Sequence, residues 1–583
     1  MFKKLLVANR GEIALRVMRS ARELAIATVA VYSEADRDAR HVSYADEAYL
    51  LGPAEPAHSY LSGDRIIEVA RQAGADAIHP GYGFLAENAP FARAVIAAGI
   101  GWVGPKPEAI EAMGDKVAAR RAMVAAGVPV VPGGTDPLAD VAAARDAAKR
   151  YGLPLAIKAS GGGGGRGLKV ARTLAEVESA FNTARREAIA YFKNGTLYAE
   201  RYLENPKHVE LQILADKHGT TLHIGERDCS LQRRHQKLVE EAPALVSERV
   251  RERLREAGIA AAKAIGYDSV GTIECLVSNT EFFFLEMNTR IQVEHTISEM
   301  ISGIDLVREQ IRVAAGEPLG YGQDAVRFTG HSIEVRVNAE DPADNFRPAP
   351  GIITSYREPS GFGVRIDSAA HAGMAITPQY DSMIAKLIVW APDRSQALQR
   401  LERCLKDYAI AGVPTTIDFV RSLIHVPAVA DGTYGTATLE PFALTYAGAS
   451  NGRAPAAEAA VSEAPSDAIR IEVNGKLFRV RFIDTPAALG AAQTPAAAPR
   501  APKRDRKALA SSGNSILTPM HGIVVELPVK AGDAVSEGQV VAVIEAMKMM
   551  NEIRAHRAGK VAAVNAAAGA TVEAQSALVT LET

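Results

Sequence analysis

The chain has 583 residues, which is enough for three or more domains with sizeable cores. Its formal net charge is −2, so we expect neither a nucleic-acid partner nor a charged membrane surface. No apolar run approaches the roughly 18 residues of a membrane-spanning helix. The three cysteines show no CxxC spacing, which fits a reducing compartment, and we expect a cytoplasmic protein.

The N-terminal segment alternates predicted strands and helices up to about residue 104. Lys4–Ala8 is typical of a buried strand, a helix is predicted to begin within Asn9–Glu12, and Ala27–Tyr32 predicts a second strand. This βαβ unit is similar to a dinucleotide-binding fold. It contains no GxGxxG motif, however, so binding of NAD is not predicted.

A glycine-rich stretch, Gly161–Gly167, lies between the predicted strands Leu155–Lys158 and Leu168–Val170. The order strand, loop, strand predicts a hairpin flap, and it does not match a Walker A loop, which leads into a helix. Consecutive glycines can turn several backbone N–H groups toward one anion, which favours a phosphate-binding loop. A flexible linker is the alternative, and the position between two strands argues against it.

The segment Glu226–Lys237 concentrates charged side chains beside apolar strands. Its arginine, histidine and lysine residues indicate a site that handles an anion. On this segment alone, a solvated charged loop is the better interpretation.

Two glutamates are predicted to face each other on a hairpin. If the hairpin is centred on Thr280, Glu274 lies directly opposite Glu286. Like charges in a partly buried site need a cation or a shared proton, and carboxylate oxygens favour Mg²⁺. An exposed acidic face is the alternative, but the aromatic run on the same hairpin suggests burial. The side chain of Cys275 should point to the opposite face and pack.

Arg290 and Glu294 follow this hairpin and place a cation and a base beside the proposed metal site. A local salt bridge between the two is an equally good interpretation. Further along, Glu334–Asp341 and Tyr380–Met383 place polar residues on predicted strands. From Asp393 to about residue 446 the pattern predicts a helical region of mixed charge.

Linker-like composition follows. Asn451–Asp467 is rich in alanine, glutamate and proline, whereas Ala468–Phe482 is a predicted β-hairpin with an Asn474-Gly475 turn. A two-stranded hairpin of this length is too short to fold alone. Thr485–Asn514 is rich in alanine and proline, so we expect it to be extended or disordered, and we attribute its basic residues to solubility.

The C-terminal segment contains an internal repeat. Aligning Pro519–Ala546 with His556–Thr583, an offset of 37 residues, places Gly522 on Gly559. Each half alternates apolar and polar residues, so two similar β halves are expected to pack together. Lys548 lies at the joint between them, flanked by methionines, where a tight turn would hold its ammonium group in water. A plain surface lysine is the alternative.

Together these stretches resemble a known family. Residues 1 to about 446 resemble a biotin carboxylase of the ATP-grasp superfamily, and Ile516–Thr583 resembles a biotinyl carrier domain, whose Ala-Met-Lys-Met turn carries biotin on the lysine. The whole chain is similar to the alpha subunit of a biotin-dependent acyl-CoA carboxylase of the acetyl-/propionyl-CoA type. The stretches that carry the resemblance, besides Ala-Met-Lys-Met, are Ala8–Ala14, His79–Glu87, Gly161–Gly167, Glu226–Lys237, Glu286–His295 and Arg336–Asp341.

The resemblance implies an α/β multidomain fold with an ATP-grasp biotin carboxylase, a small β segment and an all-β biotinyl domain of the lipoyl-like hammerhead type. The implied parts are an N-terminal α/β subdomain at 1–115, the ATP-grasp domain at 116–330 with its lid at about 130–205, the C-terminal carboxylase subdomain at 331–446, linkers with the hairpin (468–482) at 447–514, and the carrier domain at 515–583.

The resemblance also implies a role for each site residue. ATP phosphates would be held by Lys116, Lys158, Gly162, Gly163, Gly164 and Gly165. Adenosine would be bound by Glu200, Leu203, His208 and Leu276. Near the phosphates and bicarbonate would lie Gln232, His235 and Lys237. Mg²⁺ or Mn²⁺ would be bound by Glu274, Glu286 and Asn288. Bicarbonate would be seated by Arg290, Gln292 and Val293. Glu294 would deprotonate bicarbonate, Arg336 would stabilise the biotin enolate, and Lys548 would carry biotin.

The implied reaction uses ATP and bicarbonate to carboxylate biotin through carboxyphosphate. We expect a separate carboxyltransferase (beta) subunit, because the chain ends at Thr583 with no room for that domain. The hairpin 468–482 is expected to dock that partner. A biotin protein ligase and self-association of the carboxylase domain are the other expected interactions.

Three alternatives remain at this point. The first is an ATP-grasp ligase with a lipoyl-type carrier, against which the methionines beside Lys548 argue. The second is a scaffold with an inactive ATP-grasp domain, against which the complete set of site residues argues. The third is a biotin-dependent carboxylase of a substrate other than an acyl-CoA.

Overall fold

A computed structural model describes the chain apart from residues 135, 161–166, 193, 235, 447–467, 474–475, 482–513, 519–521, 547–548, 574 and 583. It divides into two compact units, residues 1–449 and 450–583, each of which is considered by itself. Within the described parts, no helix combines the length and the apolar character needed to cross a membrane. Cys229, Cys275 and Cys404 are buried free thiols, as expected for a protein without structural disulfides.

The first unit begins with a five-stranded parallel sheet in the order β3-β2-β1-β4-β5. Both faces of β1 are buried: Leu5 packs toward α1, and Leu6 packs toward α3 and α4. The predicted βαβ unit is therefore confirmed. Its elements are β1 (Lys4–Val7), α1 (Gly11–Glu23), β2 (Ala27–Ser33), α2 (Arg40–Tyr44), β3 (Glu47–Gly52), α3 (Gly63–Ala73), β4 (Ala77–His79), α4 (Ala89–Ala97) and β5 (Gly101–Trp102).

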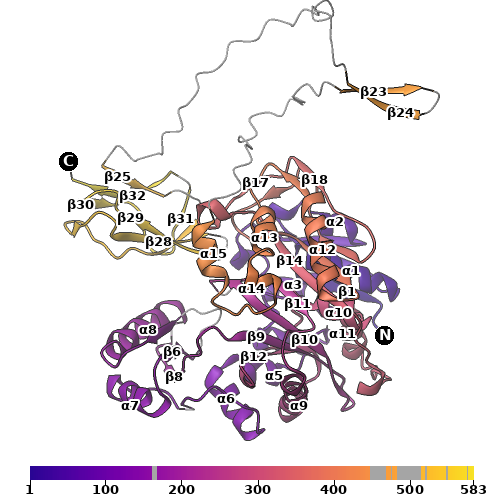
Figure 1. The fold of residues 1–583 in the computed structure, drawn as a ribbon, viewed down its shortest axis with the longest axis horizontal. Helices are drawn as coiled ribbons and strands as arrows, with labels where there is room; N and C mark the ends of the chain where they lie inside the picture. The colour runs from indigo at the N-terminus through magenta and orange to yellow at the C-terminus, as the bar shows by residue number, and fades with distance from the viewer. Residues whose placement is uncertain are drawn as a thin grey trace, which may run out of the picture. The chain divides into compact units, whose positions relative to one another are not determined.

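A small lobe follows the helices α5 (Pro107–Gly114) and α6 (Lys116–Ala125), and it stands off the rest of the unit (Figure 1). Its antiparallel sheet has the order β7-β6-β8, and alanine-rich faces of two helices pack against it. β6 and β7 pair as the hairpin that the sequence predicts, while the glycines between them lie outside the described residues. The elements of the lobe are α7 (Val141–Tyr151), β6 (Leu155–Ala159), β7 (Leu168–Ala171), α8 (Val177–Phe192) and β8 (Leu197–Arg201).

An eight-stranded antiparallel sheet, β13-β12-β9-β10-β11-β14-β21-β19, forms the largest part of the unit. One face of its first three strands packs on α9, and Cys275 lies there with a raised thiol pKa because it is buried. The pairing of β11 with β14 joins the segments 116–330 and 331–446 in one sheet. The strands are β9 (Lys207–Ala215), β10 (Thr221–Arg233), β11 (Gln236–Ala242), β12 (Ser269–Ser278), β13 (Glu281–Asn288), β14 (His331–Asn338), β19 (Val364–Ser368) and β21 (Met383–Ala391).

Helices and short strands complete the unit, and the helical region predicted after Asp393 is confirmed. The helices are α9 (Glu248–Ala264), α10 (His295–Ser302), α11 (Leu306–Ala314), α12 (Arg394–Asp407), α13 (Ile417–Leu423), α14 (Pro427–Ala430) and α15 (Leu439–Thr445). The short strands are β15 (Glu340–Asp341), β16 (Arg347–Pro348), β17 (Gly351–Ile352), β18 (Ser355–Arg357), β20 (Ala375–Ile376) and β22 (Ala409–Ala411).

In the second unit, the predicted hairpin is present as β23 (Ala468–Val473) and β24 (Lys476–Arg481). The C-terminal repeat is also confirmed, because an offset of 37 residues maps each strand of the sheet β25-β32-β30-β27 onto the sheet β29-β28-β26-β31. Gly532 and Gly569, which the offset superimposes, both have positive φ angles of +94° and +86°. The strands are β25 (Ser515–Leu517), β26 (Gly522–Glu526), β27 (Ala534–Val535), β28 (Val540–Ala546), β29 (Met549–Arg554), β30 (Gly559–Val564), β31 (Thr571–Val572) and β32 (Ala577–Leu581).

Gly133 and Gly134 differ in how much space separates them from β8. A Cβ atom added to Gly133 would lie 2.6 Å from the Cβ atom of Glu200, whereas one added to Gly134 would meet nothing closer than 3.5 Å. We expect Gly133→Ala to lower the free energy of unfolding by about 1–3 kcal/mol through overpacking. Gly134→Ala is the matched control and should change it by less than about 0.5 kcal/mol. Thermal unfolding followed by circular dichroism measures the stability of both variants. Equal unfolding midpoints would contradict the close contact between Gly133 and Glu200.

Candidate functional site

The polar side chains of the eight-stranded sheet gather on the face opposite the α9 core. β9 alternates strictly, so that His208, Glu210 and Gln212 share one face while the residues between them enter the core. The segment Glu226–Lys237 forms parts of β10 and β11, and most of its charged side chains are buried. Its interpretation as a solvated loop is therefore wrong. The buried charges are tolerated because Glu226, Arg227 and Asp228 are ion-paired, while Arg233 donates to Asn345.

At the centre of this face lies Lys237, whose ammonium group contacts three buried carboxylates. Its Nζ atom donates to Glu210, lies 2.7 Å from Oε1 of Glu294 and lies 3.2 Å from Oε1 of Glu274. Burial alone would lower the pKa of this lysine, but the three glutamates raise it well above its usual range. Lys237 is therefore a fixed positive charge.

Glu294 is 2% exposed and lies between two cations. Besides Lys237, the Nη2 atom of Arg336 donates to its Oε2 atom at 2.9 Å. Burial would raise the pKa of Glu294, but Lys237, Arg336 and Arg227 lower it well below the usual value. The side chain is ionised and can accept a proton.

The hairpin register matches the sequence prediction: Glu274 pairs with Glu286, and Thr272 pairs with Asn288. The predicted centre on Thr280 is wrong, because Ser278 pairs with Glu281 across the turn Asn279-Thr280. A bulge at Leu285 separates the two registers, so that Cys275 pairs with Phe284. The two glutamates contact different cations. Burial would raise the pKa of Glu274, but Lys237 and His208 hold it well below the usual value, while Glu286 accepts from Lys116 at 2.6 Å.

The carboxylate of Glu274 also interacts with several polar side chains around it. His208 Nε2 lies 2.9 Å from its Oε2 atom, and the amides of Asn288 and Gln292 donate to Oε1 at 2.6 and 2.9 Å. Gln232 in turn donates to Nδ1 of His208 at 3.0 Å. One residue assigned by resemblance to adenosine (His208), two assigned to the metal (Glu274 and Asn288) and one assigned to bicarbonate (Gln292) are thus connected by hydrogen bonds.

Arg290 and Glu294 do not pair with each other, so the interpretation as a local salt bridge is wrong. The Nε atom of Arg290 donates to Glu87 at 2.9 Å, and its Nη2 atom donates to Asn288 at 2.9 Å. Glu87 also accepts from the backbone N–H of Thr289 at 3.1 Å. The N-terminal sheet domain therefore fixes the start of the segment 289–294.

The remaining predicted residues fall into three groups. Lys158 bonds to Glu200, whose other oxygen accepts from Arg120 at 3.0 Å. Leu203 and Leu276 are half-buried, and the carbonyl oxygen of Val293 accepts from Lys386 at 2.8 Å. Three predicted sites lie outside the described residues: Gly162 to Gly165, His235 and Lys548.

The sequence interpretation missed several buried charges that hold this site. Arg227 is fully buried and donates to Gln212, Ser298, Glu210, Thr272 and Gln292. Glu210 has a pKa raised to about 7 because it is buried beside Glu294 and Glu274, although Lys237 and Arg227 oppose the rise. The alternation of polar and apolar residues in His208–Ile213 was the signal that could have identified Glu210.

The donor set suits a hard divalent cation. Glu274 and Glu286 supply oxygen atoms on adjacent strands, Asn288 adds an amide, and Glu274 is ionised as a ligand must be. His208, Glu210 and Glu274 also bring possible ligand atoms within 4.8 Å of one another. There both carboxylates already have cationic partners, because Lys237 contacts both and Arg227 contacts Glu210.

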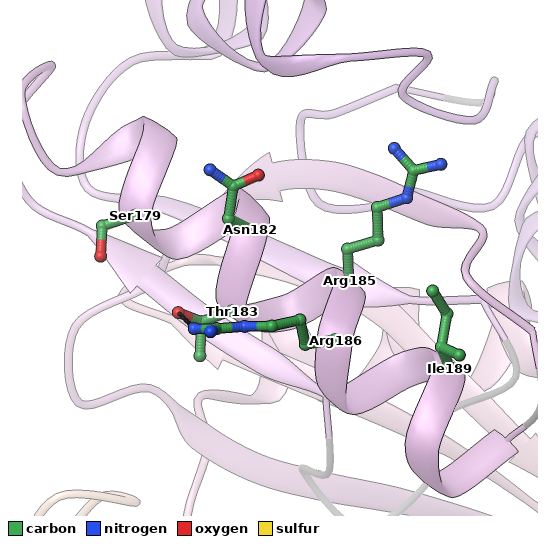
Figure 2. A pocket seen from close by; sticks show the side chains of 6 residues that line it. All are labelled: Ser179, Asn182, Thr183, Arg185, Arg186 and Ile189. Atoms are coloured by element: carbon green, nitrogen blue, oxygen red, sulfur yellow. Dashed lines mark hydrogen bonds between the residues drawn. The ribbon is translucent and has the colours of Figure 1, made fainter.

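A shallow pocket on α8 shares no residue with this network (Figure 2). All of its lining side chains, Ser179, Asn182, Thr183, Arg185, Arg186 and Ile189, come from one helix. Arg186 lies across Thr183, 3.4 Å from its hydroxyl oxygen. The pocket holds neither an acid nor a nucleophile activated by a base, so it offers no chemistry.

Family profiles match most of the chain. They are "Biotin carboxylase, N-terminal domain" at 1–110, "Carbamoyl-phosphate synthase L chain, ATP binding domain" at 115–321, "Biotin carboxylase C-terminal domain" at 334–441 and "Biotin-requiring enzyme" at 514–581.

Curated relatives extend this similarity. A biotin carboxylase of Halalkalibacterium halodurans is 52% identical over 75% of this chain and 97% of its own length. The biotin-dependent acyl-coenzyme A carboxylase alpha3 subunit of Mycobacterium leprae is 43% identical over 98% of this chain and 97% of its own length. The 2-oxoglutarate carboxylase small subunit of Hydrogenobacter thermophilus is 50% identical over 77% of this chain and 95% of its own length.

Solved structures show the same fold for the first unit. The biotin carboxylase domain dimer of Hydrogenobacter thermophilus 2-oxoglutarate carboxylase, in complex with MgADP, ADP and bicarbonate, has a TM-score of 0.74 and 50% identity, and the match covers 77% of this chain and all of that one. A biotin carboxylase of Campylobacter jejuni has a TM-score of 0.73 and 46% identity, covering 75% of this chain and 98% of that one.

The buried network should be costly to break at Arg227. We expect Arg227→Met to lower the free energy of unfolding by about 3–5 kcal/mol, because it leaves Oε2 of Glu210 and several buried polar atoms without their donor. Arg145→Met removes an exposed pair with Glu178 and should cost less than about 1 kcal/mol. Chemical unfolding followed by circular dichroism compares the two, and similar losses would refute the central role of Arg227.

Proposed function

This chain belongs to the biotin carboxylase family and carries a biotin-attachment domain in the same polypeptide, and on that premise we propose that it carboxylates its own biotin for an acyl-CoA carboxylase. Its activity is that of an ADP-forming ATP-grasp ligase that uses ATP, bicarbonate, Mg²⁺ and biotin. The observation that carries the proposal is the buried Glu294 carboxylate between Lys237 and Arg336, next to Glu274.

Glu294 is the proposed base for bicarbonate, seated by Arg290, Gln292 and Val293. One bicarbonate oxygen attacks the γ-phosphorus of ATP, the bond to ADP breaks, and the bicarbonate proton moves to Glu294. Its low pKa makes Glu294 a weak base while Lys237 and Arg336 are paired with it. Bicarbonate is an anion, and when it binds beside Glu294 it competes for Lys237 and Arg336. This competition raises the pKa of Glu294, so Glu294 is a stronger base when bicarbonate is bound.

The other proposed roles are those that the resemblance implies for these residues. Lys116 and Lys158 bind ATP phosphates, and Glu200, Leu203, His208 and Leu276 bind adenosine. Glu274, Glu286 and Asn288 would hold Mg²⁺, which neutralises phosphate charge when it is bound. Arg336, paired with Glu240 at 2.6 Å, would stabilise negative charge on the ureido oxygen of biotin when biotin is bound. Burial of Glu294 and Glu274 excludes water from the place where the labile carboxyphosphate forms.

Biotin is proposed to be attached to Lys548, where it supplies the nitrogen that accepts the carboxyl group. The strands on either side support this position: β28 and β29 pair up to Ala546 and Met549, so only Met547 and Lys548 separate them in sequence. A biotin protein ligase is the partner that would attach the group. Lys548 itself lies outside the described residues.

We further propose a separate carboxyltransferase subunit, acetyl-CoA or propionyl-CoA as the acceptor, and self-association of the carboxylase domain. The full-length similarity to a chain named an acyl-CoA carboxylase alpha3 subunit supports the first two, and the dimer named for the Hydrogenobacter structure supports the third. A second candidate acceptor is a 2-oxo acid, favoured by the relative named for 2-oxoglutarate carboxylase.

Replacing Glu294 tests the proposed base. We expect Glu294→Gln to slow bicarbonate-dependent ATP cleavage by about 10²–10⁴-fold, because an amide cannot accept the proton. The fold should survive, since Lys237 keeps Glu210 and Glu274, and Arg336 keeps Glu240. Glu248→Gln, on an exposed carboxylate, is the control. A Glu294→Gln protein with the full bicarbonate-dependent rate would remove Glu294 from the mechanism.

Transfer of labelled bicarbonate tests the acceptor and the partner together. With its co-purified carboxyltransferase, the chain should transfer label to acetyl-CoA or propionyl-CoA and not to pyruvate or 2-oxoglutarate.

Deleting 468–482 should release the partner while bicarbonate-dependent ATP cleavage continues, because an isolated two-stranded hairpin gains stability from a binding surface. Label in a 2-oxo acid would refute the acyl-CoA acceptor, and an intact complex after the deletion would refute docking by the hairpin.

A further inference from the structure

Lys386 is a fully buried lysine that none of the proposed roles uses. It lies on β21, and its register partners on the neighbouring strands are Arg336 on β14 and Asp367 on β19. The three side chains therefore form one row across the sheet. Arg336 and Lys386 are like charges side by side, which is unfavourable unless each has its own acceptor.

The two cations of this row bind consecutive residues. Arg336 donates to the carboxylate of Glu294 at 2.9 Å, and Nζ of Lys386 donates to the carbonyl oxygen of Val293 at 2.8 Å. These contacts fix both the backbone and the side chain at the C-terminal end of the segment 289–294. Glu87 fixes its N-terminal end through Thr289 and Arg290.

Lys386 is held in place by carboxylates. Its Nζ atom lies 3.4 Å from Oε2 of Glu12 and 3.7 Å from Oδ2 of Asp367. The other oxygen of Glu12 accepts from the hydroxyl group of Tyr82. A continuous set of contacts therefore runs from Tyr82 through Glu12 and Lys386 to Val293, and it joins the N-terminal sheet domain to the base.

We infer that Lys386 is a positioning residue for bicarbonate-dependent ATP cleavage, acting through the Val293 carbonyl group to set the place of the bicarbonate seat and of Glu294. This inference rests on the proposed function. A shift of about 1 Å in such a group costs up to about 10²-fold in rate, so the anchor matters although it touches no substrate.

The full-length double variant Glu12→Gln/Lys386→Met tests the role without leaving Glu12 as an unpaired buried charge. We expect the Michaelis constant for bicarbonate to rise and kcat to fall, with kcat/KM for bicarbonate reduced about 10–100-fold. The Michaelis constant for ATP should stay within about two-fold, because Lys116 and Lys158 are untouched. Glu402→Gln/Lys406→Met is the matched control, since it removes a Glu–Lys ion pair of α12 whose lysine is exposed and leaves the bond of Lys386 to Val293 intact; its constants for bicarbonate should stay near those of the wild type.

Lys386→Arg provides a second test if the double variant is unstable. It keeps the charge but changes the donor geometry, so kcat/KM for bicarbonate should fall while the Michaelis constant for ATP holds. Unchanged bicarbonate constants in a folded variant, or equal losses for both substrates, would overturn the inference. Wild-type protein without bicarbonate-stimulated ATP cleavage would instead refute the proposed function itself.

Discussion

The site depends on one shared cation. Glu210, Glu274 and Glu294 come from β9, β12 and the segment before α10, and all three are at least nine-tenths buried. Three carboxylates at such short distances would repel one another strongly in a medium of low polarity. The ammonium of Lys237, on β11, contacts each of them and favours their ionised forms. The pKa values of Glu274 and Glu294 stay well below the usual range, whereas that of Glu210 is still raised to about 7. Without it, burial would neutralise the acids by raising their pKa values.

The surrounding fold can be understood as the support for this cluster. The eight-stranded sheet has one apolar face, which packs, and one polar face, which carries the charges. The segment 289–294 crosses the polar face and is fixed at both ends, by Glu87 from the N-terminal sheet domain and by Lys386 from β21. Glu87 and Lys386, which are about 300 residues apart in sequence, thus both contact this six-residue segment.

Periodic features of this structure could be predicted from the sequence. The opposition of Glu274 and Glu286 was predicted from a hairpin centred on Thr280; the turn is instead Asn279-Thr280, and the bulge at Leu285 brings Glu286 opposite Glu274. The two sheets of the carrier follow from a repeat of fixed offset. The network could not be predicted in the same way. Arg227 and Gln292 are 65 residues apart in sequence, and no local pattern shows that they bond. For the same reason Glu226–Lys237 was better explained by a loop: the buried partners that its charges require lie elsewhere in the chain.

The same long-range pairing determines how strong a base Glu294 can be. A carboxylate with two cations at hydrogen-bond distance binds a proton poorly, and a carboxylate alone in a buried site would already be protonated. The carboxylate with two cations cannot easily take a proton from bicarbonate, and the isolated carboxyl group already holds a proton and cannot accept another. A carboxylate base avoids both limits when the cations that contact it also contact other carboxylates. Lys237 has Glu210 and Glu274, and Arg336 has Glu240, so neither cation is left unpaired when the charge of Glu294 is neutralised by a proton. Proton transfer in this site redistributes existing ion pairs, and it does not leave an isolated buried charge.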